Sequence, residues 1–224
     1  MTAPLPAAVL WDMDGTLVDS EPYWIAEEHA LVESYGGRWS QEHAMTLVGQ
    51  SLLASGRYIA QHSPVTLSPE EVVDRLVDGV GARLRRRVPW RPGGLELLTD
   101  VRAAGIPCAL VTMSYRRLTD LLEAALPEPL FDVVVCGDEV ARGKPFADPY
   151  LAAAAALGVE PLDCVAIEDS EAGMRSAVAA GVPTIVVASV KPVPGMRGSV
   201  QLSTLRGLGV ADLVDVVQET AQSA

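Results

Sequence analysis

The segment AAVLWDMDGT, residues 7–16, is the most informative part of this chain about its architecture. Its first half, Ala7–Trp11, is too short for a helix and is apolar throughout instead of alternating. This pattern is typical of a strand that is buried on both faces of a parallel sheet. Its second half places two aspartates, Asp12 and Asp14, directly after the strand in a turn that contains glycine. The stretch therefore predicts a doubly buried strand that ends in an acidic turn.

The same strand pattern recurs four times along the chain. The further apolar runs are Cys108–Thr112, Val133–Cys136, Cys164–Ile167 and Thr184–Val187. Helical patterns lie between or beside them, at Gly94–Ala104, Arg116–Leu126, Pro149–Leu157 and Glu171–Ala180. Alternating strands and helices predict right-handed crossovers and a three-layer α/β core with a parallel sheet. After the last run we expect a loop over Lys191–Gly209, which is rich in proline and glycine, and a final surface helix over Val210–Thr220.

The segment between residues 19 and 90 interrupts this alternation. It contains several helical patterns and no convincing strand. The clearest helix begins after Ser68, which has Glu71 three residues later and so predicts a capping box. Apolar residues then recur at helical spacing, at Val73, Leu76, Val77, Val80 and Leu84. We therefore expect an all-helical cap domain at residues 19–90, inserted into a core made of residues 1–18 and 91–224.

The composition argues against several classes of protein. Hydrophobic residues make up 49% and charged residues 21%, which is the balance of a folded globular chain. The net charge of −12 would repel the phosphates of a nucleic acid, so we expect no nucleic-acid partner. The sequence shows neither a secretory leader nor a run of about eighteen apolar residues, so we expect a cytoplasmic protein without membrane contact. The three cysteines, which are odd in number and far apart, are expected to be buried reduced thiols: Cys108, Cys136 and Cys164.

The paired aspartates are the first candidate site. Ligands of open parallel sheets bind beyond the carboxyl ends of the strands, where Asp12 and Asp14 lie. Two close carboxylates raise the cost of ionising both, so a cation must join them or one must keep its proton. Two other interpretations exist, an ordinary turn and part of a calcium loop. The calcium loop is disfavoured because Asp19 and Glu21 are poorly spaced to supply the remaining ligands.

Other strand ends supply further polar groups. Thr112 follows the second run, Lys144 lies in a loop after the third, and Glu168 and Asp169 end the fourth. Each has a purely structural alternative: a strand-end hydroxyl for the threonine, a solvated surface charge for the lysine and a helix cap for the acidic pair. An anionic ligand would nevertheless need a local cation in so acidic a chain, which favours a role for Lys144.

Taken in order, these groups form four motifs: Asp12-Met13-Asp14-Gly15-Thr16, then Thr112, then Lys144-Pro145, then Glu168-Asp169-Ser170-Glu171-Ala172-Gly173. They resemble the four motifs of the haloacid dehalogenase-like hydrolase superfamily, over a span from Ala8 to about Val187. The helical insertion is similar to the cap of the branch that contains sugar-phosphate phosphatases and β-phosphoglucomutases. The resemblance implies a Rossmann-like core and a phosphatase that acts on a small phosphorylated metabolite.

The resemblance also implies roles in catalysis. Asp12 would be the nucleophile that forms an aspartyl-phosphate, and Asp14 the general acid and base. Thr112 and the N–H of Met113 would hold the phosphate oxygens, and Lys144 would neutralise charge on Asp12 and the phosphoryl group. Met113 departs from the family pattern, in which asparagine or a small residue is common.

The cofactor implied by the resemblance is Mg²⁺. Its ligands would be the Asp12 side chain, the Asp14 backbone carbonyl and Asp169, with Glu168 as a possible fourth. Oxygen ligands of this kind suit a hard cation that brings two anionic groups together.

Substrate specificity is expected to depend on the cap, which would close over the site. The candidate cap contacts are Glu21, Gly49 and Gln50, with weaker candidates at Tyr23, Trp24 and Arg57. The sequence does not name the substrate, and a monomer is expected to be sufficient for the reaction.

Three other functions remain open at this point. A phosphosugar mutase is the nearest, but mutase relatives usually have a histidine near the position of Trp24 and an arginine near that of Leu52. A catalytically silent domain that binds a phosphometabolite is disfavoured because all four motifs keep their reactive side chains. Dehalogenation is disfavoured by Asp14, since the resemblance associates the second aspartate with phosphatases and mutases.

Overall fold

The computed structural model describes residues 4–222, with side chains described through residue 216. Within this range the chain builds one six-stranded, all-parallel sheet in the order β3-β2-β1-β4-β5-β6. The strands are β1 Ala8–Trp11, β2 Cys108–Val111, β3 Val133–Val135, β4 Cys164–Glu168, β5 Thr184–Val186 and β6 Ser199–Gln201. The first strand thus lies inside the sheet, and its carboxyl end is flanked by those of β2 and β4, where the strand order reverses. Crevices at such points are where open α/β sheets bind ligands.

The burial of β1 explains why its sequence is apolar at every position. Val9 and Trp11 belong to one core cluster, whereas Ala8 and Leu10 belong to a second cluster on the opposite face. All four side chains are completely buried. Because successive side chains of a strand point to opposite faces, both faces of β1 need apolar residues.

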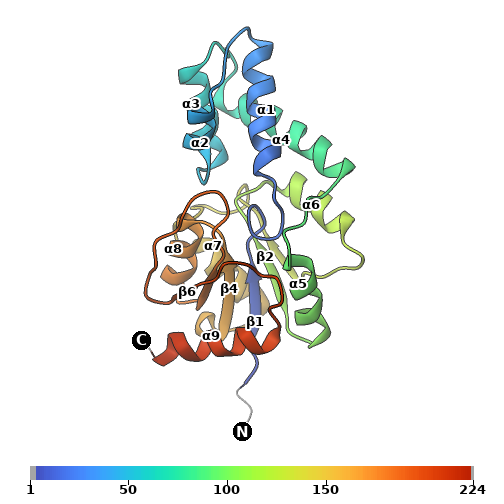
Figure 1. Cartoon of the computed structure of the whole chain (residues 1–224), viewed down its shortest axis with the longest axis vertical. Helices are drawn as coiled ribbons and strands as arrows, with labels where there is room; N and C mark the ends of the chain where they lie inside the picture. The colour runs from blue at the N-terminus through green and yellow to red at the C-terminus, as the bar shows by residue number, and fades with distance from the viewer. Residues whose placement is uncertain (1–3, 223–224) are drawn as a thin grey trace.

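Helices cover both faces of the sheet, as Figure 1 shows. Helices α7 and α8 pack on one face, and α5 and α9 on the other. The core helices are α5 Gly94–Ala103, α6 Arg116–Ala125, α7 Asp148–Leu157, the short 3₁₀ helix η1 Pro161–Asp163, α8 Glu171–Ala179 and α9 Val210–Gln222. The predicted three-layer α/β architecture is therefore confirmed.

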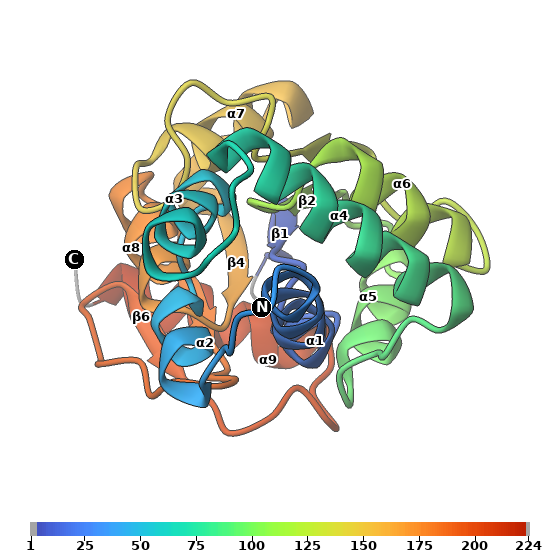
Figure 2. The ribbon, with the colours of Figure 1, turned by 90° about the horizontal axis from the view of Figure 1, so that it is seen from above.

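Four more helices lie together beyond the carboxyl ends of the strands (Figures 1 and 2). They are α1 Glu21–Ser34, α2 Gln41–Leu47, α3 Leu52–His62 and α4 Pro69–Arg86. Helix α4 begins with the predicted capping box between Ser68 and Glu71, and its predicted apolar face is buried. Val18 and Trp90 form an isolated antiparallel bridge, so the chain leaves the core and returns to it at neighbouring positions. The domain boundaries at residues 18 and 90 stay a prediction.

One predicted loop contains a strand. The segment Lys191–Gly209 includes β6, which pairs with β5 through Thr184 and Ser199. No apolar run marks this strand, because Ser199–Gln201 is a short edge strand with one apolar residue and partly exposed side chains. Polar composition is usual for an exposed edge, where only one neighbour is available.

The thiols are free and buried, as predicted, at Cys108, Cys136 and Cys164. Burial raises the pKa of Cys108 to about 12 and that of Cys164 to about 11, so both are protonated at neutral pH. Among the described helices, none has both the length and the apolar character needed to cross a membrane.

Candidate active site

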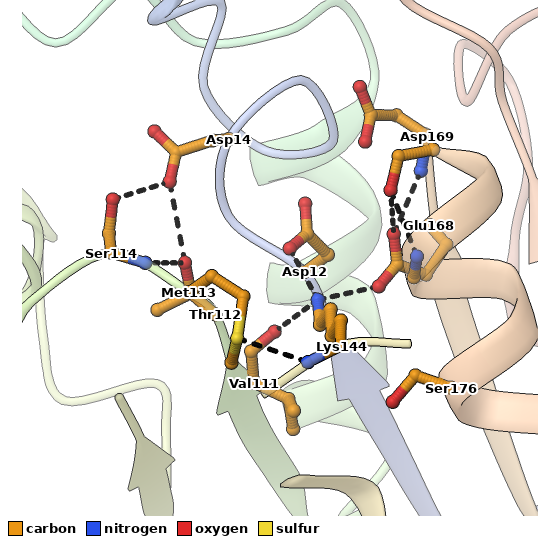
Figure 3. Close-up of polar contacts among 12 residues, drawn as sticks. Asp12, Asp14, Val111, Thr112, Met113, Ser114, Lys144, Glu168, Asp169 and Ser176 are labelled. Carbon is orange, nitrogen blue, oxygen red and sulfur yellow. Dashed lines mark hydrogen bonds and ion pairs between the residues drawn. The ribbon is translucent and has the colours of Figure 1, made fainter. Parts of the chain in front are cut away.

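Lys144 contacts polar groups at the ends of three strands (Figure 3). Its Nζ lies 2.7 Å from Asp12 Oδ1, 2.5 Å from Glu168 Oε1 and 2.8 Å from the Val111 carbonyl oxygen. Its side chain is only 5% exposed, which excludes the interpretation of a solvated surface charge. Burial lowers the pKa of Lys144, but the carboxylates of Asp12 and Glu168 outweigh it and hold the pKa above its usual value. The lysine is therefore charged at neutral pH.

Asp12 is buried, with one carboxylate oxygen left free. Its Oδ1 accepts from Lys144, while Oδ2 is buried and has no partner among the described residues. Burial raises the pKa of Asp12 to about 7, and the charge of Lys144 opposes this rise. A buried oxygen without a partner is costly, so its presence indicates a position kept for a ligand.

Gly15 permits the turn that brings the acidic groups together. Its φ of +87° lies in the left-handed region that favours glycine. A Cβ at this position would collide with the carboxylate of Asp169. The first and fourth motifs can therefore approach one another only because residue 15 has no side chain.

Three carboxylates converge at this point. Ligand atoms of Asp12, Glu168 and Asp169 all lie within 4.8 Å of one another. Burial, reinforced by the charges of Asp12 and Glu168, holds the pKa of Asp169 well above its usual range. Lys144 compensates only part of this negative charge. A divalent cation with oxygen ligands fits the remaining negative charge of the cluster.

Glu168 already has protein partners on both oxygens. Oε1 accepts from Lys144 and from the hydroxyl of Tyr150 at 2.6 Å, while Oε2 accepts from the Asp169 N–H at 3.3 Å and from Ser170 Oγ at 3.4 Å. Helix α8 is capped instead by Ser170, whose hydroxyl accepts from the N–H of Gly173. The acidic pair is therefore not needed as a helix cap, which was its structural alternative.

Asp14 is held by hydroxyl groups, on the other side of the site from the acidic cluster. Its carboxylate accepts from Ser20 at 2.5 Å, Ser114 at 2.7 Å and Thr112 at 3.3 Å. In Figure 3 it is turned toward Ser114, whereas Asp12 faces Lys144. The two aspartates of the first motif thus have separate sets of partners.

The second motif supports both aspartates. Thr112 Oγ1 accepts from the N–H of Ser114 at 3.0 Å, which fixes the hydroxyl that donates to Asp14. The sulfur of Met113 accepts from the backbone N–H of Lys144 at 3.2 Å. The departure from the family pattern at residue 113 therefore has a structural consequence, because the thioether anchors the lysine loop.

A cavity of about 150 Å³ lies between these groups and the cap helices. Core residues that line it include Asp12, Asp14, Thr112, Met113, Lys144 and Asp169. All three principal cap candidates line it as well, namely Glu21, Gly49 and Gln50, and so does Trp24. Two weaker candidates do not: Arg57, and Tyr23, whose hydroxyl donates to the Arg87 carbonyl.

Several lining residues were missed by sequence reasoning. Glu28 lies one helical turn after Trp24 and two turns after Glu21 on α1. Helical spacing alone could therefore have placed it on the same face of the helix as these two residues. Ser114 follows Thr112 by two residues and could have been found as part of the same loop. Tyr150, which donates to Glu168 but does not line the cavity, was also missed; it lies in the alanine-rich helix α7, where its sequence neighbours give no signal.

Fold and site together define an α/β enzyme with its reacting groups at the carboxyl ends of a parallel sheet. The chain belongs to the haloacid dehalogenase-like hydrolase family, whose model matches residues 9–187. It is therefore a hydrolase of that family, as the motif resemblance predicted.

Two curated relatives are similar in sequence to this chain over most of its length. The chain is 34% identical over 199 residues to hexitol phosphatase A of Escherichia coli K12. The aligned region covers 84% of this chain and 86% of that protein. It is 32% identical over 202 residues to the protein CbbY of Rhodobacter capsulatus, covering 81% and 85%.

A solved structure is similar over almost its whole length. CbbY from Rhodobacter sphaeroides in complex with xylulose-(1,5)bisphosphate superposes with a TM-score of 0.84 at 27% identity, covering 93% of this chain and 99% of that one. A β-phosphoglucomutase from Clostridium difficile, at 19% identity and a TM-score of 0.80, shares the fold.

Proposed function

We propose that this chain is a Mg²⁺-dependent phosphatase that hydrolyses a small phosphomonoester, a sugar phosphate or similar metabolite, through a phosphorylated Asp12. The observation that carries the proposal is the free, buried Oδ2 of Asp12, beside Lys144 and on the wall of the cavity. The names of the relatives support it, since hexitol phosphatase A and a probable pseudouridine-5′-phosphatase of Drosophila melanogaster, 32% identical, are both phosphatases.

The metal would be held by the acidic cluster. Asp12 and Asp169 are the proposed side-chain ligands, with the Asp14 backbone carbonyl as a third. Glu168 lies within reach, but its Oε1 already accepts from Lys144 and Tyr150 and its Oε2 from Asp169 and Ser170, which favours a supporting role over direct ligation. When bound, Mg²⁺ would offset the repulsion between an anionic nucleophile and an anionic phosphate.

The first half of the reaction would use residues from three motifs. Asp12 Oδ2 attacks the phosphorus atom, and the bond from phosphorus to the leaving oxygen breaks. Asp14, in its protonated form, gives its proton to that oxygen. The N–H of Met113 and the hydroxyl of Thr112, which would turn from Asp14 to the substrate, hold phosphate oxygens, and Lys144 keeps Asp12 oriented.

The second half would reverse the role of Asp14. It takes a proton from a water molecule, and the water oxygen attacks phosphorus, releases inorganic phosphate and restores the Asp12 carboxylate. Ser20 and Ser114, which donate to Asp14, would set the direction of its carboxylate between the two steps.

Covalent trapping tests the proposal directly. The protein should hydrolyse p-nitrophenyl phosphate with Mg²⁺, and mass spectrometry after rapid quenching should place the phosphoryl group on Asp12. A structure solved with fluoroberyllate should show that group on the same carboxylate. An adduct on another side chain would refute the assignment of the nucleophile. A complete lack of hydrolysis would favour the silent phosphometabolite-binding domain instead.

The mutase alternative is disfavoured by the cavity wall. Mutase relatives usually have histidine and arginine near the positions of Trp24 and Leu52, and both of these apolar residues line the cavity here. Incubation with β-glucose 1-phosphate separates the two activities, because a mutase makes glucose 6-phosphate and a phosphatase releases inorganic phosphate.

We further propose a cytoplasmic monomer. Light scattering of the purified protein tests the oligomeric state, and cell fractionation tests the location.

A further inference from the structure

Glu28 forms an unusual part of the cap-side wall of the cavity. It lies in the middle of α1 and is only 4% exposed, yet it lines the cavity. Among the described residues a single group donates to it, the indole Nε1 of Trp39, at 3.0 Å from Oε2. Its other oxygen, Oε1, has no donor within the part of the chain that the structure describes. A buried carboxylate with an unused acceptor next to a cavity is suited to accept a hydrogen bond from a ligand.

The charges around the cavity are strongly unbalanced. Its acidic lining residues are Asp12, Asp14, Glu21, Glu28 and Asp169. Among the described residues that line it, Lys144 is the only basic one.

The one basic residue has no donor to spare. An ammonium group has three donors, and those of Lys144 go to Asp12, Glu168 and the Val111 carbonyl. The chain's other lysine, Lys191, directs its Nζ to the carbonyl of Val48 at 2.9 Å and does not line the cavity. The charge of Lys191 acts on Glu21 from outside the cavity, but among the described residues that line the cavity no cation is left to pair with a second anionic group on a substrate.

We propose that the substrate carries its phosphate as its only anionic group, and that Glu28 selects a leaving group with neutral hydroxyls over one with a carboxylate or a second phosphate. This inference rests on the proposed phosphatase function and names the substrate class of the same site. A hydroxyl can donate to the free oxygen of Glu28, whereas an anionic group would be repelled by the buried carboxylate.

We expect this chain and one structural relative to differ in the ligands that they accept. The similar CbbY structure from Rhodobacter sphaeroides holds xylulose-(1,5)bisphosphate, which has two phosphates. We expect this chain to discriminate against such a ligand, despite the shared fold.

The test uses two compounds that differ at one carbon. Glucitol 6-phosphate has a hydroxymethyl group where 6-phosphogluconate has a carboxylate. Phosphate release from each at pH 8, above the pKa of about 7 to which burial raises Glu28, gives a ratio of kcat/KM, which should favour glucitol 6-phosphate by at least about tenfold. Where turnover is slow, the same pair is compared as inhibitors of p-nitrophenyl phosphate hydrolysis.

Two variants test whether Glu28 causes the preference for glucitol 6-phosphate. Glu28→Gln removes the charge, keeps the volume and retains an oxygen that can accept from Trp39, and it should reduce the ratio at least about threefold. Glu33→Gln removes a charge from an exposed position on the same helix and should leave the ratio unchanged.

The outcomes are distinguishable. Three results would overturn the inference if p-nitrophenyl phosphate is still hydrolysed. They are equal use of the two compounds, a kcat/KM ratio unaffected by Glu28→Gln, and failure of glucitol 6-phosphate both as substrate and as inhibitor. Absence of any p-nitrophenyl phosphate hydrolysis would overturn the proposed function itself.

Discussion

Lys144 Nζ lies 2.7 Å from Asp12 Oδ1, although the two residues are 132 positions apart in the chain. Both side chains are almost completely buried, at 5% and 8% exposed. A buried lysine held between Asp12 and Glu168 orients the free oxygen of Asp12 without occupying it. This ion pair joins the first motif to the third and is the basis of the first two predictions.

Asp12→Asn should lower p-nitrophenyl phosphate hydrolysis at least about a thousandfold, because the amide oxygen is a poor nucleophile. Circular dichroism should show an unchanged fold, since Glu168 still pairs with Lys144. Retention of most of the activity would exclude Asp12 as the nucleophile.

Lys144→Met should lower the free energy of unfolding by about 3–5 kcal/mol, because it leaves two buried carboxylates without their cation. Urea denaturation measures the change. Lys191→Met is the matched control, since Lys191 also precedes a proline but makes an exposed hydrogen bond to Val48. Equal stability of the two variants would contradict the central role of Lys144.

Removal of metal should stop turnover reversibly. EDTA should abolish hydrolysis and excess Mg²⁺ should restore it, and Mg²⁺ should raise the Tm of the protein because it binds the folded state. Asp169→Asn should raise the Tm without metal, since it relieves repulsion among buried carboxylates, and should lose most of the rise caused by Mg²⁺. Hydrolysis that does not need metal would be inconsistent with the proposed site. So would an Asp169→Asn variant whose Tm still rises fully with Mg²⁺.

Glu28 should make stability depend on pH. Burial raises its pKa to about 7 from an ordinary value of 4.5, so the folded state keeps a proton that the unfolded state releases between these values. The unfolded state then binds fewer protons, and stability falls as the pH rises through this window. Relative to Glu28→Gln, the wild type should lose on the order of 2–3 kcal/mol between pH 5 and pH 8.

Thermal or urea unfolding of the two proteins at both pH values checks this prediction. The comparison with the variant removes the contribution of Glu21, whose pKa burial also raises to about 7. A difference that stays constant with pH would show that Glu28 is ionised throughout.

The interior strands were predictable because burial on both faces of a sheet leaves an unbroken apolar run. The predicted run Cys108–Thr112 and the observed β2, Cys108–Val111, differ by one residue. The edge strand β6 was not predictable, since a strand with one neighbour and exposed side chains needs no such run.

The order of the motifs was enough to predict that Asp12 and Lys144 approach one another. It was not enough to predict the hydroxyls around Asp14, because Ser20 and Ser114 come from segments that only the folded chain brings together. Glu28 was missed for a different reason. Helical spacing places it on the same face as Glu21 and Trp24, but only the folded chain shows that the cavity extends that far along α1.

The bridge between Val18 and Trp90 has a consequence for how this enzyme can diversify. The helical insertion begins and ends at adjacent points, so another segment could be exchanged there without lengthening or shifting any strand of the sheet. Evolution, or a designer making chimeras, could then alter which molecules are admitted while the reacting groups keep their positions.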